Sequence, residues 1–200
     1  MNVTNQTVKN KTRYLKRVIH TTCAESAIPP GYRIKKEGEM SMNKAVYAAS
    51  FDPFTNGHLD VLKKACGIFG EVHAVIAINA DKTRKYSQIY MKEAIEKVVE
   101  RNGITNCKVM VYDGLIAQYC IDNNIQYTVR GLRNFMDFGY EENIANVNKR
   151  IMPQLETVYL RADHADISSS AVRELYSYNR DVSDMVPEEI LPILRTYMRG

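Results

Sequence analysis

Apolar and polar positions alternate in blocks from Lys44 onward. Runs that are apolar on both faces are followed by stretches whose apolar residues recur at helical spacing. The predicted strands are KAVYAAS, VHAVIAIN, CKVMVY, QYTVRG and ETVYL. The predicted helices cover His58 to about Phe69, about Gln88 to Arg101, LIAQYCIDN, about Asn134 to Arg150, and two short segments after Ser168 and Pro187. Because strands of this kind, separated by helices, form parallel sheets covered on both sides, we predict an α/β domain with a doubly wound five-stranded parallel sheet.

The first 41 residues differ from the rest in pattern and in charge. They have weak periodicity, and AIPPGYRIKKEGEMS is typical of turns and linkers. They hold eight Lys or Arg and three acidic residues, a net charge of +5 against +4 for the whole chain, which leaves −1 for the remaining 159 residues. We therefore predict an extension over residues 1–41, either disordered or an untranslated leader, and one domain over residues 42–200.

The leader hypothesis depends on codons. Lys36-Glu37-Gly38 can be encoded AAG-GAG-GGN, which contains a purine-rich bacterial ribosome-binding sequence, and Met40 and Met42 follow at once. On this hypothesis, KKEGEMSM belongs to an untranslated leader whose codons have been written as protein sequence. The alternative is a translated basic extension that contacts an acidic partner.

Composition and charge argue against membrane, secreted and nucleic-acid-binding proteins. No apolar run is long enough to span a bilayer, and the N-terminus lacks the apolar core of a secretory signal. The slightly acidic domain offers no electrostatic reason for nucleic-acid binding. We expect a cytoplasmic protein that binds neither membrane nor nucleic acid.

The segment AASFDPFTNGHLDVL links the first predicted strand to the first helix. In doubly wound folds ligands bind at the carboxyl ends of the strands, and the free N–H groups of a helix start attract phosphate. Gly57 permits close approach of a phosphate, and His58 places an imidazole beside it. The turn alone is equally compatible with ordinary turn residues and an incidental histidine. Since G-x-G-x-x-G and a P-loop are absent, a redox dinucleotide enzyme is disfavoured.

Three further segments add charge and hydroxyl groups at the same edge. Lys82 follows the second predicted strand, Arg130 and Arg133 follow the fourth, and Ser168 to Ser170 begin a helix after the fifth. Each alone is compatible with a solvated lysine, surface arginines or an N-cap. Together with His58 they predict an anion site for a polyphosphate.

Four segments, FDPFTNGHLD, RGLRNFMDFGYE, NVNKRIMPQLETVYL and ISSSAVREL, resemble the bacterial phosphopantetheine adenylyltransferases, members of the nucleotidylyltransferase superfamily with the H/T-x-G-H motif. The resemblance covers roughly Lys44 to Arg199, and R-G-L-R…D-F-x-Y-E is its discriminating part. It implies a Rossmann-like nucleotidyltransferase fold and transfer of AMP from ATP to 4′-phosphopantetheine, giving dephospho-coenzyme A and pyrophosphate, with Mg²⁺. It also implies a homohexamer.

The resemblance assigns roles to residues of this chain. His58 stabilises the transition state at the α-phosphate, and Ser50, Lys82 and Arg130 hold the attacking phosphate. The implied ATP contacts are Ser50, Phe51, His58, Gly131, Leu132, Arg133, Glu141, His164, Ala165, Asp166, Ile167, Ser168, Ser169 and Ser170. Leu115, Ile116 and Asn148 are implied for the pantetheine arm, although plain helix core is an equal reading for Leu115 and Ile116. No protein side chain is expected to bind metal, because Mg²⁺ would sit on the ATP phosphates.

The chain departs from the family pattern in three places. Ala49 stands where a glycine is usual, Asp166 stands where an apolar residue is common, and the usual Glu-Glu-Arg after Lys82 is replaced by SQIYMKEA. Two alternatives stay open: a nucleotidyltransferase for another phosphorylated acceptor, such as nicotinate or glycerol phosphate, and a catalytically silent nucleotide-binding regulator.

Overall fold

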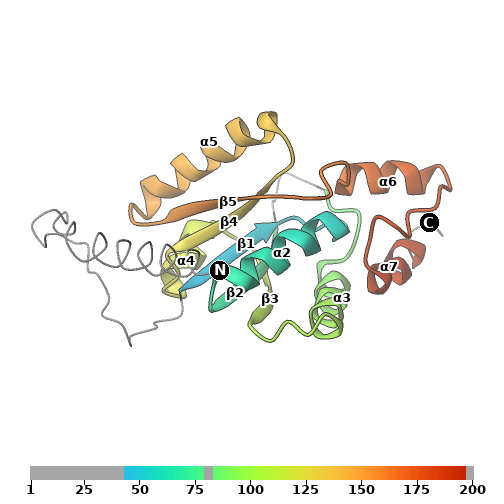
Figure 1. The fold of residues 1–200 in the computed structure, drawn as a ribbon, viewed down its shortest axis with the longest axis horizontal. Helices are drawn as coiled ribbons and strands as arrows, with labels where there is room; N and C mark the ends of the chain where they lie inside the picture. Colours follow the sequence, from blue (N-terminus) through green and yellow to red (C-terminus); the bar gives the residue numbers. More distant parts are fainter. Residues whose placement is uncertain (1–42, 79–82, 197–200) are drawn as a thin grey trace, which may run out of the picture. The chain divides into compact units, whose positions relative to one another are not determined.

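Five parallel strands form the centre of the structure, a computed structural model that describes residues 43–78 and 83–196 (Figure 1). The strands are β1 (Lys44–Ala49), β2 (Glu71–Ala77), β3 (Cys107–Tyr112), β4 (Tyr127–Leu132) and β5 (Glu156–Arg161). They lie in the order β3-β2-β1-β4-β5. The predicted fold class is therefore confirmed.

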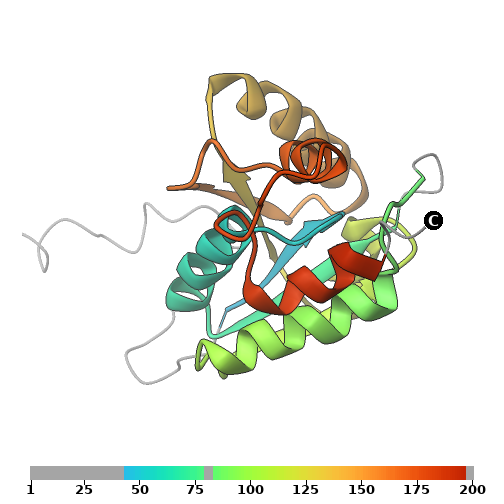
Figure 2. The same cartoon turned by 90° about the vertical axis from the view of Figure 1, so that its right-hand side faces the viewer.

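Helices cover both faces of the sheet (Figure 2). They are α2 (Asn56–Ile68), α3 (Gln88–Arg101), α4 (Ile116–Asp122), α5 (Phe135–Ile151), α6 (Ser169–Ser177), the 3₁₀ turn η2 (Glu188–Ile190) and α7 (Leu191–Thr196). In β1, Ala45 and Tyr47 join a core with α2, α3 and α7, whereas Val46 and Ala48 pack on the other face with α4. Successive side chains of a strand point to opposite faces of the sheet, and here both faces are buried. The strands therefore have continuous apolar sequences.

The sheet opens between β1, its middle strand, and β4. β1 pairs with β2 as far as Ala49↔Ile76, but its pairing with β4 ends at Tyr47↔Val129. The order in which strands are added also reverses here, because β2 and β3 lie on one side of β1, and β4 and β5 lie on the other. The carboxyl ends of β1 and β4 therefore diverge at a topological switch point, where ligands bind in this class of fold.

Side-chain caps decide where the helices at this edge begin. α2 begins at Asn56, two residues before the predicted start, because Thr55 supplies the N-cap. Asn134 and Ser168 cap α5 and α6, which begin within one residue of the predicted starts. Leu115 is the N-cap residue of α4 and precedes its helical residues.

Two predicted features lie outside the described residues: the extension over 1–41 and Lys82. Within residues 43–78 and 83–196, no helix is long and apolar enough to cross a membrane.

Candidate active site

Two cavities meet at the switch point. The first, here called the polar cleft, has a volume of about 250 Å³ and lies between the start of α2, the end of β4 and the start of α6. The second, here called the apolar cavity, has a volume of about 690 Å³ and lies between α4, α5 and the sheet. Ala48, Arg130 and Glu141 line both. Two ligands bound in the two cavities would therefore meet beside Arg130.

His58 stands at the third position of α2 with its ring oriented by a capping box. The backbone N–H of Thr55 donates to His58 Nδ1 at 3.0 Å, and the His58 N–H points back to the Thr55 hydroxyl at 3.4 Å. Burial, together with the charges of Arg133 and Arg130, lowers the pKa of His58 to about 4. The ring is therefore neutral at pH 7, with Nδ1 as an acceptor and the proton on Nε2. A histidine at this helix start thus serves as a fixed, neutral hydrogen-bond donor that lines the polar cleft.

Aromatic rings enclose the same imidazole. The centroids of Phe51 and Phe54 lie 5.1 Å and 5.6 Å from that of His58, and both phenylalanines are fully buried. Phe51 also packs edge-on against Tyr47 at 5.5 Å. These rings displace water from one side of His58, which explains the desolvation that holds its pKa down.

Two glycines let separate elements approach closely around the cleft. A Cβ on Gly57 would lie 3.4 Å from the backbone oxygens of His164 and Ile167, so the segment after β5 packs directly over α2. A Cβ on Gly131 would lie 2.8 Å from a methyl group of Val61, closer than packed side chains tolerate. Glycine is therefore a packing requirement at position 131, whereas a Cβ on Gly57 would make ordinary van der Waals contact.

Arg130 is locked at the junction of the two cavities. Its Nε and Nη2 donate to the Glu141 carboxylate at 2.5 Å and 2.7 Å, and its Nη1 donates to the carbonyl of Ala48. A bidentate pair of this kind fixes the plane of the guanidinium. Arg130 and Glu141, assigned to different substrates by the resemblance, thus act as one unit in this structure.

Arg133 is held more loosely at the outer edge. Its Nε and Nη2 donate to Asp137 at 3.0 Å and 3.2 Å, and its side chain is 38% exposed. Asp137 is a partner that the motif analysis missed. Its position four residues after Arg133, in the first turn of a helix capped by Asn134, was an available signal.

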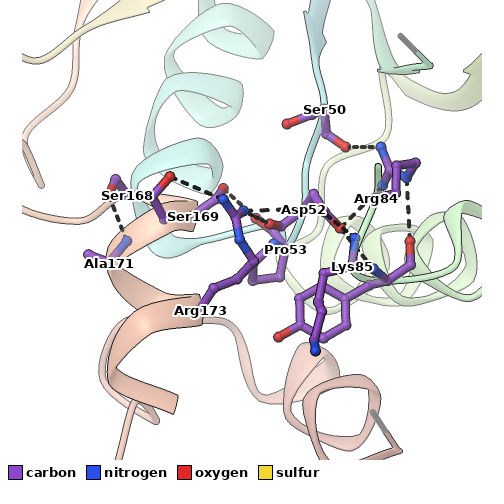
Figure 3. A network of polar contacts seen from close by, with 11 residues as sticks. Ser50, Asp52, Pro53, Arg84, Lys85, Ser168, Ser169, Ala171 and Arg173 are labelled. Atoms are coloured by element: carbon purple, nitrogen blue, oxygen red, sulfur yellow. Dashed lines mark hydrogen bonds and ion pairs between the residues drawn. The ribbon is translucent and has the colours of Figure 1, made fainter. Parts of the chain in front are cut away.

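Hydroxyl groups close the cleft at the start of α6. The Ser168 Oγ accepts from the N–H of Ala171 as the N-cap, and the Ser169 Oγ donates to the carbonyl of Pro53 at 2.8 Å (Figure 3). Both serines and Ser170 line the cleft, as predicted. The helix N-terminus therefore adds backbone donors to a site already bordered by His58.

The structure brings together most, but not all, of the predicted nucleotide contacts. The predicted nucleotide contacts that line the polar cleft are His58, Gly131, Arg133, Glu141, His164, Ile167, Ser168, Ser169 and Ser170. Five others do not line it: Ser50, Phe51, Leu132, Ala165 and Asp166. Phe51 is drawn into the core by its neighbouring rings, and Ala165 and Asp166 are exposed. Ala49, the position of the unusual methyl group, does line the cleft.

The apolar cavity contains all three residues expected beside the pantetheine arm. Leu115, Ile116 and Asn148 line it together with Ile144 and Val147 of α5. Leu115 is 62% exposed, so the alternative reading of plain helix core does not hold for this residue. A large apolar side chain left open to water at a cavity is available to pack against a ligand.

Comparisons with known proteins agree with this arrangement. The model of the cytidylyltransferase-like family matches residues 46–175. Phosphopantetheine adenylyltransferases of Leptospira biflexa, Shouchella clausii and Cytophaga hutchinsonii are 40%, 36% and 38% identical to the chain. The matches cover 73%, 79% and 73% of this chain and 91%, 99% and 97% of those proteins.

A solved structure supports the fold. A candidate nicotinate-nucleotide adenylyltransferase from Vibrio parahaemolyticus matches with a TM-score of 0.58 and 17% identity, over 80% of this chain and 98% of that one. The sequence matches go further than the fold, because their identity of 36–40% exceeds the 17% of the structural match over similarly complete lengths. The chain belongs to the phosphopantetheine adenylyltransferases of the cytidylyltransferase-like family.

Proposed function

We propose that this protein transfers the adenylyl group of ATP to 4′-phosphopantetheine, giving dephospho-coenzyme A and pyrophosphate. The observation that carries the proposal is the meeting of the polar cleft and the apolar cavity at Arg130. ATP binds in the polar cleft, which offers helix N-termini and cations to its phosphates. The pantetheine arm binds in the apolar cavity, with its phosphate at the junction.

The reaction needs no protein nucleophile. An oxygen of the acceptor phosphate attacks the α-phosphorus of ATP in line, and the bond from that phosphorus to the bridging oxygen breaks. Pyrophosphate leaves with the bonding electrons. What the protein contributes is position and compensation of developing charge. His58 Nε2–H donates to a non-bridging oxygen of the α-phosphate, and Arg130 draws the attacking phosphate toward it.

Mg²⁺ belongs to this proposal as a partner of the ATP phosphates. Among the described residues, no group of three or more His, Cys, Asp or Glu side chains could hold a metal ion. Glu141, the carboxylate that lines the polar cleft, is already engaged by Arg130. Cations and hydroxyls of the cleft fit a polyphosphate that brings its own metal, and the ion would neutralise charge on the leaving pyrophosphate.

Assembly and location complete the proposal. We place the protein in the cytoplasm as a homohexamer, as the family resemblance implies. Support for an assembly comes from the start of α5, where Phe135 and Met136 are 87% and 82% exposed. Apolar side chains this open to water mark surfaces that associate. Light scattering coupled to size-exclusion chromatography measures the number of subunits directly.

A pyrophosphate-release assay tests the function. ATP and Mg²⁺ are supplied with 4′-phosphopantetheine, pantetheine, nicotinate mononucleotide or glycerol phosphate. Of these four acceptors, we expect only 4′-phosphopantetheine to support the release of pyrophosphate. Turnover of pantetheine would contradict the attack by a phosphate, and preference for another phosphorylated acceptor would favour a sister nucleotidyltransferase. Nucleotide binding without any release would indicate a silent regulatory protein.

A further inference from the structure

A buried carboxylate lies in the turn between β1 and α2, next to the catalytic helix start. Asp52 is 7% exposed, and its carboxylate accepts the backbone N–H groups of Lys85 and Tyr86 at 3.0 Å and 2.9 Å. These bonds tie the turn to the segment that leads into α3. The site described above gives no direct role to this network, which Figure 3 shows.

Arg84 reaches into the same turn from the segment after β2. Its Nη1 donates to the backbone carbonyl of Ser50 at 2.7 Å, and its Nη2 lies 3.9 Å from Asp52 Oδ1. The side chain is only 13% exposed, and burial lowers the pKa of Arg84 while the charge of Asp52 opposes that shift. A buried guanidinium needs a compensating charge, and Asp52 supplies it.

The opposite side of the turn is held by α6. Arg173 donates from Nη1 to the backbone carbonyl of Asp52, and the same nitrogen lies 4.0 Å from Asp52 Oδ2. Ser169, which lines the polar cleft, holds the carbonyl of Pro53. Two arginines from two different segments therefore converge on one carboxylate and on the backbone beside it.

The carbonyl that Arg84 binds belongs to a strained peptide. Phe51 has φ 45°, a left-handed conformation that bulky residues rarely adopt. The Ser50–Phe51 peptide plane is therefore held away from its relaxed orientation, with the Ser50 oxygen turned toward Arg84. Such strain persists where surrounding contacts over-determine it, and it concentrates at functional sites.

Stability alone does not account for this arginine. Within the part of the chain that the structure describes, Arg84 Nη2 is buried with no hydrogen-bond partner. An unsatisfied buried donor lowers stability, and a well-packed apolar side chain in its place would avoid that cost. An apolar replacement could make neither the 2.7 Å contact with the Ser50 carbonyl nor the longer, 3.4 Å contact of Arg84 Nε with the Tyr86 carbonyl.

We propose that Arg84 is a positioning residue for adenylyl transfer: it fixes the strained Ser50–Phe51 peptide so that the Ser50 hydroxyl keeps its place for the acceptor phosphate. This inference rests on the proposed function. Without Arg84, Phe51 can relax toward negative φ, which rotates the peptide and moves the Ser50 hydroxyl.

Two substitutions and a control test this role. Arg84→Met fills the space without a donor, Arg84→Lys restores a charge and a donor, and Arg101→Ala removes a surface arginine whose partners are Glu188 and Glu189. The measurements are kcat/KM for phosphopantetheine at saturating ATP, calorimetric affinity for a non-hydrolysable ATP analogue, and thermal unfolding.

We expect Arg84→Met to lower kcat/KM for phosphopantetheine roughly 10- to 100-fold, the loss of one charge-assisted hydrogen bond. Affinity for the ATP analogue stays unchanged, Arg84→Lys recovers part of the loss, and Arg101→Ala behaves as wild type. An Arg84→Met enzyme with wild-type kcat/KM would overturn the proposal. The proposal would also be overturned if Arg84→Met and Arg84→Lys lost kcat/KM equally and in parallel with a fall in unfolding temperature. Failure of the proposed function would give a different result, because the wild-type protein itself would then be inactive with phosphopantetheine.

Discussion

The polar cleft and the apolar cavity share Arg130, yet they are built in different ways. The cleft is formed by helix starts and turn backbone whose polar groups are bound to one another, as in the Thr55–His58 capping box. The cavity is formed largely by side chains of α5, of the segment that leads into α4 and of the sheet, and its apolar residues, such as Leu115 and Val147, are open to water. One region has fixed donors, and the other has unfilled apolar surface.

This difference indicates a division of labour. Fixed dipoles and charges lower the energy of a transition state, because they need no reorganisation when charge develops. Apolar surface gains the same free energy whether the ligand is in its ground or its transition state, and it therefore contributes to binding. Substitutions in the cleft should change kcat, whereas substitutions in the cavity should change KM for the acceptor.

The largest effect is expected at His58. His58→Ala removes the neutral donor and should lower kcat by roughly 100-fold or more, the range seen when one preorganised donor is lost. His58→Gln, which keeps an N–H donor, is the matched control and should retain more activity. Steady-state kinetics and calorimetric ATP affinity are the measurements. Near-normal kcat in His58→Ala would end the division of labour proposed here.

Arg130, at the junction, should affect both substrates. Arg130→Ala removes the bidentate pair with Glu141, and we expect a loss of about 1.5–3 kcal/mol in transition-state stabilisation, the range for a hydrogen bond to a charged group. Arg130→Lys keeps the charge without the planar fork and should recover only part. If the Lys variant equals wild type, the fixed guanidinium plane is irrelevant. The values come from kcat/KM measured for each substrate in turn.

A smaller effect is expected in the apolar cavity. Leu115→Ala should raise KM for phosphopantetheine roughly fivefold, about 1 kcal/mol of lost apolar burial, and leave kcat and ATP affinity unchanged. Ile68→Ala, at a similarly exposed residue near the far end of α2, is the control. A fall in kcat as large as that of His58→Ala would contradict the comparison.

A further expected effect concerns stability against pH rather than catalysis. His58 is neutral in the folded protein down to about pH 4, whereas its unfolded pKa is about 6.5. Between these values the unfolded chain binds more protons, so the free energy of unfolding falls as pH decreases from about 6.5 toward 4. Urea unfolding of wild type and His58→Gln across this window isolates the contribution. Identical slopes for the two proteins would contradict the lowered pKa.

Much of the arrangement was predictable because its signals are local. Apolar runs predicted the five strands, and Ser168 and Asn134 predicted two helix starts. Since carboxyl ends of parallel strands share an edge, the sequence also predicted that His58, Arg130 and the serines of α6 would gather there, as the structure shows. The roles assigned to these residues stay predictions.

Pairings between distant segments were not predictable in this way. The family resemblance assigned Arg130 and Glu141 to separate substrates, and their bidentate contact depends on how α5 packs on β4. Phe51 was expected beside ATP because of its place in the motif, but packing with Tyr47 and Phe54 buries it. Ala165 and Asp166 were expected beside ATP from their position alone, and they remain exposed.

The sequence by itself determined the class of fold, the edge of the sheet that carries the site, and the kinds of group gathered there. Periodicity and capping act over a few residues, and strand order restricts where loops can meet. Tertiary structure decided the protonation state of His58 and the convergence of Arg84 and Arg173 on Asp52. Those properties arise from desolvation and charge at distances of a few ångströms, between residues that lie 32 and 121 positions apart in the case of Asp52, a separation that local pattern does not encode.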